Sequence, residues 1–315
     1  MEKIKAVVYT RKAKPGKLVC ELVDKPAPGR NEVLVKVAAA SVNAADYRLL
    51  KMGLIPKNRI FGADISGTVE ITGPEVQGFR SGDEVIGELS GYGFGGFAEY
   101  VAVPESALIP KPREITFEEA AALPLAGVTA LQALRDKGEI RRGSCVLIVG
   151  SSGGVGSFAL QLARNFGAQV TAVCSTGNVE RSFRLGASRV IDYTAEEITV
   201  GGLQYDLIVA VNGNHSLVTY RKMLKPNGIC VMAGGALSQV FRFLLLGRIF
   251  SFGTKKMRSL AAKTNRADLE LIVKLAAEGR IKPVIDRRYS LEMVPEAMQY
   301  AGTGHASGKV IINIH

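Results

Sequence analysis

Residues 146–168, VLIVGSSGGVGSFALQLARNFGA, contain the pattern that decides the fold. Four apolar residues lead into a turn with four glycines. In the segment that follows, apolar side chains recur at spacings of three and four, at Val155, Phe158, Leu162 and Phe166, which places them on one face of a helix. The stretch therefore predicts a buried strand, a tight turn and an amphipathic helix that ends at the next glycine.

The glycines of the turn have a physical task. Without Cβ atoms they let backbone N–H groups approach a pyrophosphate, and the start of the following helix adds its dipole. The spacing is G-x-x-G-x-x-G instead of the standard G-x-G-x-x-G, so the order of strand, turn and helix supports much of the assignment. The alternative is that the glycines only permit tight packing of helix on strand. The predicted cofactor-binding residues of the turn are Gly150, Ser152, Gly153, Gly154, Val155 and Gly156.

The chain on either side of this stretch indicates two kinds of architecture. In the first third, short β-rich runs are broken by Gly and Pro, which predicts a compact all-β unit. From Thr116 onward a helical stretch leads into strands separated by helical or loop segments, the βαβ pattern of a doubly wound parallel sheet. The closing, strand-like KVIINI is expected to return to the first unit. We predict an α/β protein whose first domain combines residues 1–120 and 266–315 and whose second domain is residues 121–265.

Length, charge and cysteine content limit the classes of function. The 315 residues suffice for two domains, and no window approaches the ~18 apolar residues of a membrane span. The 40 Lys and Arg exceed the 29 Asp and Glu by 11, which favours an anionic partner: a phosphorylated cofactor, a nucleic acid or an acidic membrane surface. Nucleic acid is least favoured, because aromatics are only 7% and the basic residues form no run. The four cysteines form no CxxC pair and the first residues are charged, so we expect a cytoplasmic location.

Residues 237–267 hold seven Lys and Arg, no acid, and a cluster of Phe, Leu and Ile. Two interpretations remain: a patch that docks on an anionic membrane, or the wall of an apolar substrate pocket with solvated charges. The pocket wall is favoured because the segment follows a predicted strand at the carboxyl edge of the sheet, where doubly wound folds bind ligands. Truncating Phe241, Leu245 and Phe250 is then expected to raise KM for bulky acceptors more than for small ones.

The second strand of the βαβ pattern, QVTAVC, is followed by Ser175. NAD-dependent proteins usually place Asp or Glu here, where the carboxylate binds the ribose 2′-hydroxyl. A serine hydroxyl donates to a 2′-phosphate that a carboxylate would repel, so the sequence favours NADPH over NADH. Arg181 and Arg184 can add positive charge, and an ordinary solvated helix surface is the alternative interpretation of both.

Motifs spread over nearly the whole chain allow a comparison with a known family. They include KAVVYT, SVNAADYRL, SGDEVIG, GGFAEYVAVP, the glycine turn, VCSTGN, LKPNG and GHASGKVIINI. Together they resemble the medium-chain dehydrogenase/reductase superfamily, in the zinc-independent branch of quinone oxidoreductases and enone reductases related to ζ-crystallin. The resemblance implies a GroES-like β domain, discontinuous in sequence, with an inserted Rossmann domain of doubly wound parallel sheet. It also implies a homodimer.

The resemblance extends the cofactor site. Relatives that have Arg after the Ser-Thr pair following the second strand use it to support the 2′-phosphate, whereas this chain has Gly177. Asn178 remains beside Ser175. Tyr193 matches a position where relatives place a Tyr against the adenosine phosphate, with strand-end packing as the alternative.

Two further cofactor positions are implied by the resemblance alone. Thr129 lies on a helix and would face the nicotinamide ribose and phosphate, and Lys309 would approach the cofactor from the returning tail. Ordinary structural roles for a helix Thr and a tail Lys are the alternative.

The chain departs from zinc-dependent dehydrogenases at the metal-ligand positions. Where such relatives have their first Cys ligand, this sequence reads SVN at residues 41–43, and where they have Gly-His-Glu it reads GAD at residues 62–64. None of the three histidines has ligand spacing with a cysteine. We predict no metal. Without a metal, reduction of an electron-poor quinone or conjugated carbonyl is favoured over oxidation of an alcohol.

Asn43 and Tyr47 are the candidate catalytic residues. In SVNAADY they occupy positions where relatives place polar groups, and a helical turn would let both reach one pocket. Asn43 would donate from its amide to the oxygen that gains charge, and Tyr47 or water would supply a proton. The alternatives are that Asn43 caps the helix and that Tyr47 only packs. Asp46 is interpreted as a buried structural contact.

The sequence therefore predicts an NADPH-dependent, zinc-independent oxidoreductase that acts on a quinone or an α,β-unsaturated carbonyl. The alternative from another class is an NADPH-binding protein with a structural, regulatory or RNA-binding role and little catalysis.

Overall fold

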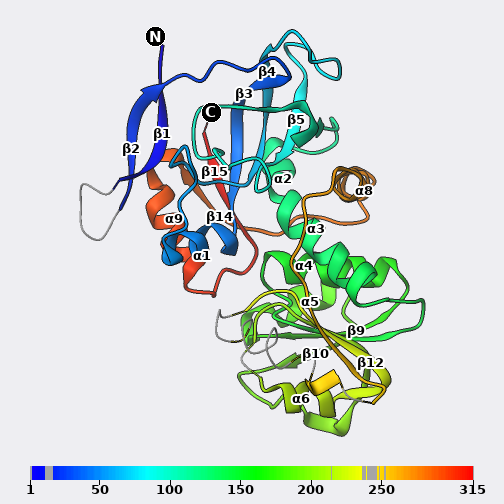
Figure 1. Ribbon diagram of the computed structural model, residues 1–315. Coiled ribbons are helices and arrows are strands. Elements are labelled where there is room, and N and C mark those ends of the chain that lie inside the picture. The colour runs from blue at the N-terminus through cyan, green and yellow to red at the C-terminus, as the bar shows by residue number, and fades with distance from the viewer. Residues whose placement is uncertain are drawn as a thin grey trace. The chain divides into compact units, whose positions relative to one another are not determined.

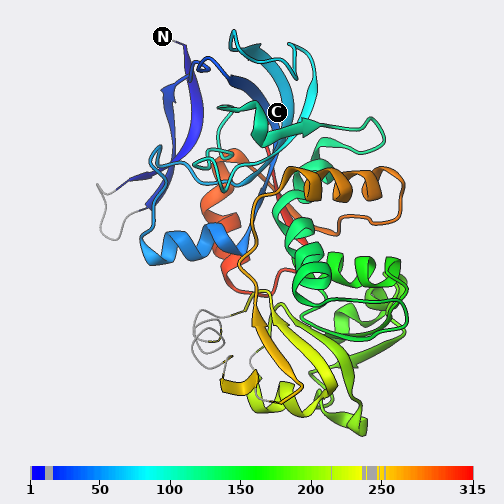
Figure 2. The ribbon, with the colours of Figure 1, turned by 45° about the vertical axis from the view of Figure 1, so that its right-hand side comes forward.

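The structure is a computed structural model that describes residues 2–10, 17–213, 215–235, 239, 247, 249–251 and 253–314. The chain divides into two compact units. The first combines Met1–Leu125 with Thr264–His315, drawn in blue to cyan and in orange to red, and the second is Ala126–Lys263, drawn mainly in green and yellow (Figures 1 and 2). The second unit is thus an insertion into the first.

The first unit is built on a mainly antiparallel sheet. Its strands are, in order across the sheet, β14 (Ile285–Ser290), β15 (Lys309–Asn313), β3 (Glu32–Val42), β4 (Asp64–Thr72), β5 (Glu84–Glu88) and β7 (Leu108–Pro110), and β6 (Tyr100–Pro104) pairs with β3. Only β14 and β15 run parallel, among the pairs of this sheet in the described residues. A separate hairpin of β1 (Lys3–Thr10) and β2 (Lys17–Asp24) completes the strands of this unit. The last strand of the chain, β15, therefore lies beside β3, a strand from the first part of the chain.

The helices of the first unit cover this sheet. They are α1 (Ala44–Met52), α2 (Phe117–Ala122), α8 (Arg266–Ala277), α9 (Val294–Gly302) and the 3₁₀ turns η1 (Glu105–Ala107) and η6 (Leu291–Met293). α2 starts at a capping box in which Thr116 accepts from the Glu119 N–H and the Glu119 carboxylate accepts from the Thr116 N–H. α3 (Pro124–Gln132) begins in this unit and continues into the second.

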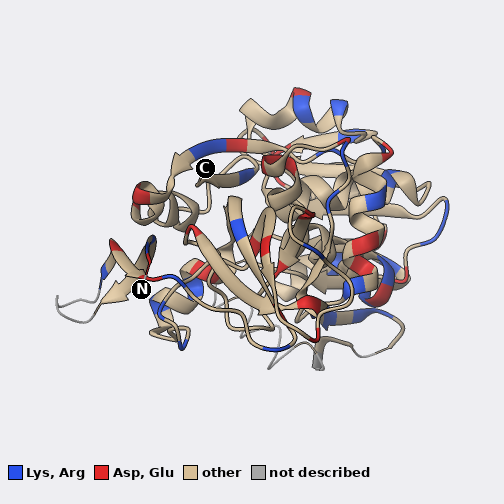
Figure 3. Ribbon diagram, turned by 90° about the horizontal axis from the view of Figure 1, so that it is seen from above, with Lys and Arg blue, Asp and Glu red and all other residues tan. Residues whose placement is uncertain are grey.

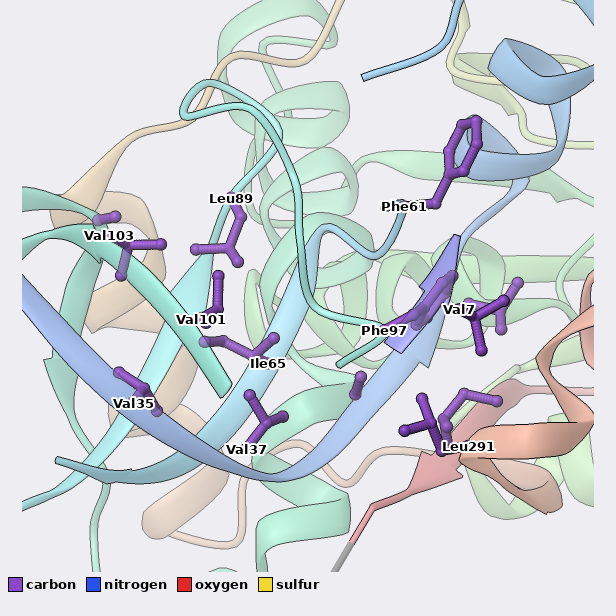
Figure 4. Packing of buried hydrophobic residues seen from close by; sticks show 14 of the residues in the cluster. Val7, Val35, Val37, Phe61, Ile65, Leu89, Phe97, Val101, Val103 and Leu291 are labelled. Atoms are coloured by element: carbon purple, nitrogen blue, oxygen red, sulfur yellow. The ribbon is translucent and has the colours of Figure 1, made fainter. Parts of the chain in front are cut away.

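The core of the first unit forms where alternate residues of the strands point to one face. Figure 4 shows Val35 and Val37 of β3 packed with Ile65 of β4, next to Leu89 and Val101. All five side chains are at most 6% exposed. This packing holds the ends of β3 and β4 in place, and the polar residues described below lie at those ends.

The second unit is a six-stranded sheet with all strands parallel. The strands are, in sheet order, β10 (Arg189–Asp192), β9 (Gln169–Cys174), β8 (Cys145–Val149), β11 (Tyr205–Ala210), β12 (Leu224–Met232) and β13 (Lys256–Ser259). The helices are α4 (Gly154–Asn165), α5 (Val179–Arg184), α6 (Leu217–Lys222), the π-helical turn η2 (Ala133–Lys137), and the 3₁₀ turns η3 (Thr176–Asn178), η4 (Val200–Gly202) and η5 (Ile249–Ser251). Strand order reverses between β8 and β11, the switch point at which such sheets bind ligands.

The predicted α/β class, with an antiparallel unit and an inserted parallel sheet, is confirmed. The predicted strand, turn and helix appear as β8 and α4, and Gly167, with φ of +75°, follows the helix. The predicted apolar stripe of α4 was too narrow, because every residue of 156–163 is buried. The helix contacts β8 and β9 and also η2, so more than one side is covered.

The prediction for the basic segment 237–267, which contains β13, cannot be compared at Phe241 and Leu245, because both lie outside the described residues. Phe250 is half-buried against the core of the second unit. In the described part of the chain, no helix combines the length and apolar character needed to cross a membrane. Figure 3 shows Lys and Arg interspersed with Asp and Glu along the ribbons.

Candidate active site

The sheet of the first unit brings together polar residues that are far apart in sequence. β15 is antiparallel to β3 with Val310 opposite Val42, so Lys309 and Asn43 are neighbours at the end of this pair. On the other side of β3, Ser41 lies opposite Asp64, the first residue of β4. We call Ser41, Asn43, Asp64 and Lys309 the polar cluster.

The polar cluster is held by short contacts in a nearly water-free environment. The Lys309 ammonium donates to Asn43 Oδ1 at 2.6 Å and lies 3.3 Å from Asp64 Oδ2. Asp64 Oδ2 also accepts from Asn43 Nδ2 and from Ser41 Oγ, each at 2.9 Å. Lys309 is 3% exposed, Asn43 7%, and Ser41 and Asp64 0%. The other carboxylate oxygen, Asp64 Oδ1, accepts from the N–H of Leu125 at 3.0 Å.

Each side chain of the polar cluster makes a hydrogen bond to another member of the cluster. A buried ammonium is tolerated only with a counter-charge, and losing one member of such a pair typically costs about 3–5 kcal/mol. Asp64 is that counter-charge for Lys309. An ammonium only donates and a carboxylate only accepts, so together they hold the Asn43 carboxamide with its oxygen toward Lys309 and its nitrogen toward Asp64.

Asp46, the third residue of α1, binds the backbone of Asn43, a member of the polar cluster. Its carboxylate accepts from the N–H of Asn43 at 2.8 Å and from the N–H of Gly62 at 3.2 Å, and the side chain is fully buried. Burial is the main reason that the pKa of Asp46 is raised to about 7, and the nearby charge of Asp64 adds to it, while the two N–H groups act in the opposite direction. Asp46 is thus a structural contact at the start of α1, as interpreted from the sequence.

Tyr47 makes a different kind of contact from Asn43. Its half-buried ring packs against α9 at Gly302, where an added Cβ would clash with the ring. The hydrogen bonds of the described residues do not include its hydroxyl. The structure therefore groups Asn43 with Lys309, a pairing not predicted from the sequence. Tyr47 packs its ring on α9, and its catalytic role stays a prediction.

The residues at the metal-ligand positions bear on whether this site can hold zinc. Of the oxygen donors in residues 41–43 and 62–64, Ser41 donates to Asp64, and Asn43 and Asp64 contact the Lys309 ammonium. A divalent cation placed there would be repelled by that charge at short range, so this donor set does not suit zinc. Elsewhere in the described ranges, no group of three or more His, Cys, Asp and Glu side chains is arranged to hold a metal ion.

The glycine turn of the second unit suits a phosphate group. Gly150 has φ of +82°, and its N–H and that of Ser151 donate to the carbonyl of Val173 in β9. A Cβ at Gly156 would collide with the carbonyl oxygen of Gly150, so this glycine also permits close approach of helix and strand. Gly153 precedes α4 without a side-chain cap, and the first turn contains no acid. The first N–H groups of the helix thus form a site where negative charge is stabilised.

The predicted adenosine residues gather at the ends of β9 and β10. The N–H of Tyr193 donates to the carbonyl of Cys174, which places Tyr193 beside the strand end that leads to Ser175. Tyr193 is 52% exposed, so strand-end packing does not account for it. Asn178 Nδ2 donates to Ser175 Oγ at 3.1 Å, and Arg181 donates to Asn178 Oδ1.

Three other predicted residues lie apart from this network. Arg184 is exposed and pairs at 3.8 Å with Glu180 on the same helix, which fits the solvated-surface interpretation. Thr129 lies in α3 and is 7% exposed. Lys309, predicted to bind the cofactor, belongs to the polar cluster. The cofactor roles of Thr129, Ser175, Asn178, Tyr193 and Lys309, like those of the glycine turn, stay predictions.

Asp192 is a residue at this edge that the sequence interpretation missed. It ends β10 directly opposite Cys174, and its carboxylate accepts from the hydroxyls of Thr176 at 2.6 Å and Thr194 at 2.7 Å. These hydrogen bonds, that from Thr176 first, lower its pKa. An ionised carboxylate therefore lies on the neighbouring strand, opposite the residue that precedes Ser175, although no acid directly follows β9 in the sequence. Recognising VIDY as the neighbouring parallel strand would have revealed it.

Comparisons with known proteins agree with this geometry. The models of the alcohol dehydrogenase GroES-like domain and of zinc-binding dehydrogenase match residues 29–113 and 185–312. The chain is 33% identical over 305 residues to the chloroplast envelope quinone oxidoreductase homolog of Arabidopsis thaliana, with 92% of each chain covered. It is 34% identical over 298 residues to 2-methylene-furan-3-one reductase of Solanum lycopersicum, over 90% of this chain and 72% of that one.

Solved structures give the same relationship. The quinone oxidoreductase from Coxiella burnetii superposes with a TM-score of 0.87 at 29% identity, over the full length of both chains. The fold, an antiparallel unit with an inserted parallel sheet, agrees with the family of these relatives. The family predicted from the motifs is confirmed. This chain belongs to the medium-chain dehydrogenase/reductase superfamily, in its quinone oxidoreductase branch.

Proposed function

We propose that this chain is an NADPH-dependent, zinc-independent reductase of quinones or α,β-unsaturated carbonyls. The observation that supports this most directly is the polar cluster, in which a buried ammonium lies against Asn43 and Asp64 at the positions where zinc-dependent relatives bind their metal. Acceptors that are already electron-poor need less polarisation than an alcohol, so a hydrogen-bond donor suffices in place of a metal. Relatives named quinone oxidoreductase homolog, 2-methylene-furan-3-one reductase and NAD(P)H oxidoreductase support the same substrate class.

In this proposal Asn43 stabilises the oxygen of the acceptor. One hydrogen of its Nδ2 is donated to Asp64, and the other is directed to the acceptor oxygen as that oxygen gains negative charge. The nicotinamide, when bound, supplies the hydride. The preorganised carboxamide costs no reorientation during the reaction, because Lys309 and Asp64 hold it from both ends. Water supplies the final proton, since Tyr47 packs on α9.

The cofactor preference rests on the second unit. Ser175 offers a hydroxyl where an NAD-specific protein has an acid, and Tyr193 lies exposed beside it. The uncapped first turn of α4 receives the pyrophosphate. Asp192 places negative charge near the 2′-phosphate and limits the preference, so we expect NADPH to be favoured over NADH without NADH being excluded.

The test is the oxidation of nicotinamide cofactor by the purified protein. We expect NADPH absorbance to decay when quinones or enones are added, faster than NADH at equal concentration, and simple alcohols with NADP to give no reaction. Tight binding of NADPH without turnover of any acceptor would instead support the alternative function, a binding protein with a structural, regulatory or RNA-binding role. A homodimer remains expected from the family, and sedimentation of the same sample measures it.

A further inference from the structure

The buried ammonium of Lys309 makes its shortest contact with a neutral group. Its distance to Asn43 Oδ1 is 2.6 Å, whereas its distance to Asp64 Oδ2 is 3.3 Å. Charge neutralisation alone requires only the carboxylate. The closer contact to the amide oxygen therefore calls for its own explanation.

A cation on the oxygen of a carboxamide changes the nitrogen of the same group. It draws electron density toward the oxygen, and the N–H groups become stronger donors. It also removes the choice between the two orientations of the amide, because an ammonium accepts no hydrogen bond. Asn43 is 7% exposed, so water competes little for either atom.

The carboxylate of the cluster is held as firmly as the ammonium. One oxygen of the Asp64 carboxylate accepts hydrogen bonds from Ser41 Oγ, Asn43 Nδ2 and Lys309 Nζ. The other accepts from the N–H of Leu125. The side chain is fully buried. A carboxylate with so many donors stays in one position, and it fixes the nitrogen end of the Asn43 amide while Lys309 fixes the oxygen end.

We propose that Lys309 is a positioning residue for the reduction: a built-in cation that orients the Asn43 amide and strengthens it as the donor to the acceptor oxygen. This inference rests on the proposed function and extends it. It also replaces a direct contact of Lys309 with the cofactor by a contact with Asn43.

The test uses variants of Lys309 in the full chain, with a quinone that the wild type reduces. Lys309→Met keeps the length of the side chain and removes the charge, and we expect kcat to fall about 10- to 100-fold while the Kd for NADPH changes less than about twofold. Lys309→Arg keeps a cation and is expected to recover most of the loss. An unchanged kcat in folded Lys309→Met, or a weaker Kd for NADPH with unchanged kcat, would overturn the proposal.

Lys111→Met is the matched control. The Lys111 side chain is 5% exposed in the same unit, pairs with Glu84 at 2.9 Å and donates to the carbonyls of Pro112 and Ile115. It makes no contact with the polar cluster among the described residues. We expect this variant to lower Tm and to leave kcat within about twofold of the wild type. An equal loss of kcat in this control would show that removing any buried lysine slows the enzyme, and would contradict a specific role for Lys309.

Lys309→Met leaves Asp64 buried without its counter-charge, so a second variant guards against misfolding. Lys309→Met combined with Asp64→Asn removes both charges together. We expect this double variant to fold and to remain slow, because Asn43 still lacks its cation. A double variant that folds with wild-type kcat would contradict the proposal.

A spectroscopic readout separates this proposal from the proposed function. In protein labelled with ¹⁵N-asparagine, the side-chain amide of Asn43, assigned by its loss in Asn43→Ala, is expected to shift in Lys309→Met and to stay unchanged in Lys111→Met. If the wild type reduces no acceptor but this shift is seen, the contact stands and the reductase assignment fails. If the wild type is active and the signal is unmoved, the role of Lys309 fails.

Discussion

At the scale of a single residue, the contacts of Asn43 depend on residues that lie far from it in the sequence. Its sequence context, SVNAADY, is compatible with a helix cap or with a catalytic donor. In the structure its N–H is bound by Asp46, and its side chain is held between Lys309 and Asp64. The backbone of Asn43 therefore belongs to the helix start, and its side chain, the candidate catalytic donor, belongs to the polar cluster, so substitutions can separate the two roles.

We expect Asn43→Ala to lower kcat by about 10²-fold with little change in the Kd for NADPH, because the variant loses the amide donor and keeps the backbone N–H. Steady-state kinetics with a quinone and a binding titration measure the two quantities. Tyr47→Phe is the control, since the ring still packs on Gly302, and its rate is expected to stay within about twofold. A lower Tm with unchanged kcat in Asn43→Ala would assign Asn43 to structure alone.

We also expect single residues to decide the choice between NADPH and NADH. Gly177 is exposed, has no positive φ, and an added Cβ there meets no atom within 4 Å. Gly177→Arg therefore adds a charge without strain, and Asp192→Asn removes an opposing one. We expect each to raise the ratio of NADPH to NADH efficiency about 5- to 50-fold, and Ser175→Asp to lower it, as measured by kcat/KM with both cofactors. A ratio that does not change in any of the three would place the 2′-phosphate elsewhere.

Asp46 makes the stability of the fold depend on pH. Its pKa is raised to about 7 in the folded chain and is near 3.9 when unfolded. The folded state therefore binds more protons between these values, and the contribution of neutral Asp46 is present below pH of about 4 and lost as pH rises through about 7. We expect Asp46→Asn to flatten this part of the pH dependence of unfolding by urea. A slope that is the same in both proteins would mean that Asp46 stays ionised.

At the scale of an element, the turn between β8 and α4 combines packing and binding. Gly156 allows α4 to approach the carbonyl of Gly150, and Gly153, which has no side chain, leaves the first N–H groups of the helix without a side-chain cap. The two interpretations of these glycines, tight packing and phosphate binding, are thus both supported by the geometry at once.

We expect Gly156→Ala to lower the free energy of unfolding by about 1–3 kcal/mol and to weaken NADPH binding at least tenfold, because the new methyl group pushes the helix away from the turn. Gly177→Ala is the control, since its Cβ meets open space, and both quantities should stay unchanged. Denaturant unfolding and a fluorescence titration measure them. Normal NADPH affinity in a destabilised Gly156→Ala would separate packing from binding.

At the scale of the whole molecule, the distribution of charge bears on whether the protein uses a metal ion or a hydrogen-bond donor in its reaction. The chain has a formal charge of +11, and one of its cations, Lys309, is buried against Asn43 and Asp64. We expect the purified protein to contain less than stoichiometric zinc and to keep its activity in chelators. Elemental analysis and assays with and without chelator measure this. One tightly held zinc per chain, with activity lost on its removal, would contradict it.

The α/β class and the glycine turn could be predicted from the sequence because both are written in contiguous residues. Apolar periodicity over 146–168 specifies a strand and a helix, and a turn with φ of +82° at its first glycine needs a residue without Cβ. The absence of an acid directly after β9 is visible in the same way. The narrow stripe predicted for α4 failed because periodicity does not show how many neighbours cover a helix.

By itself, then, the sequence determined the local elements, the candidates Asn43 and Ser175, and the family. Only the tertiary structure decided what surrounds them. Lys309 lies 266 positions from Asn43, and they meet because β15 pairs with β3 in one register. Asp192 reaches Thr176 because β10 lies beside β9. Strand order and register arise from the packing of whole sheets, and burial then raises the pKa of groups such as Asp46.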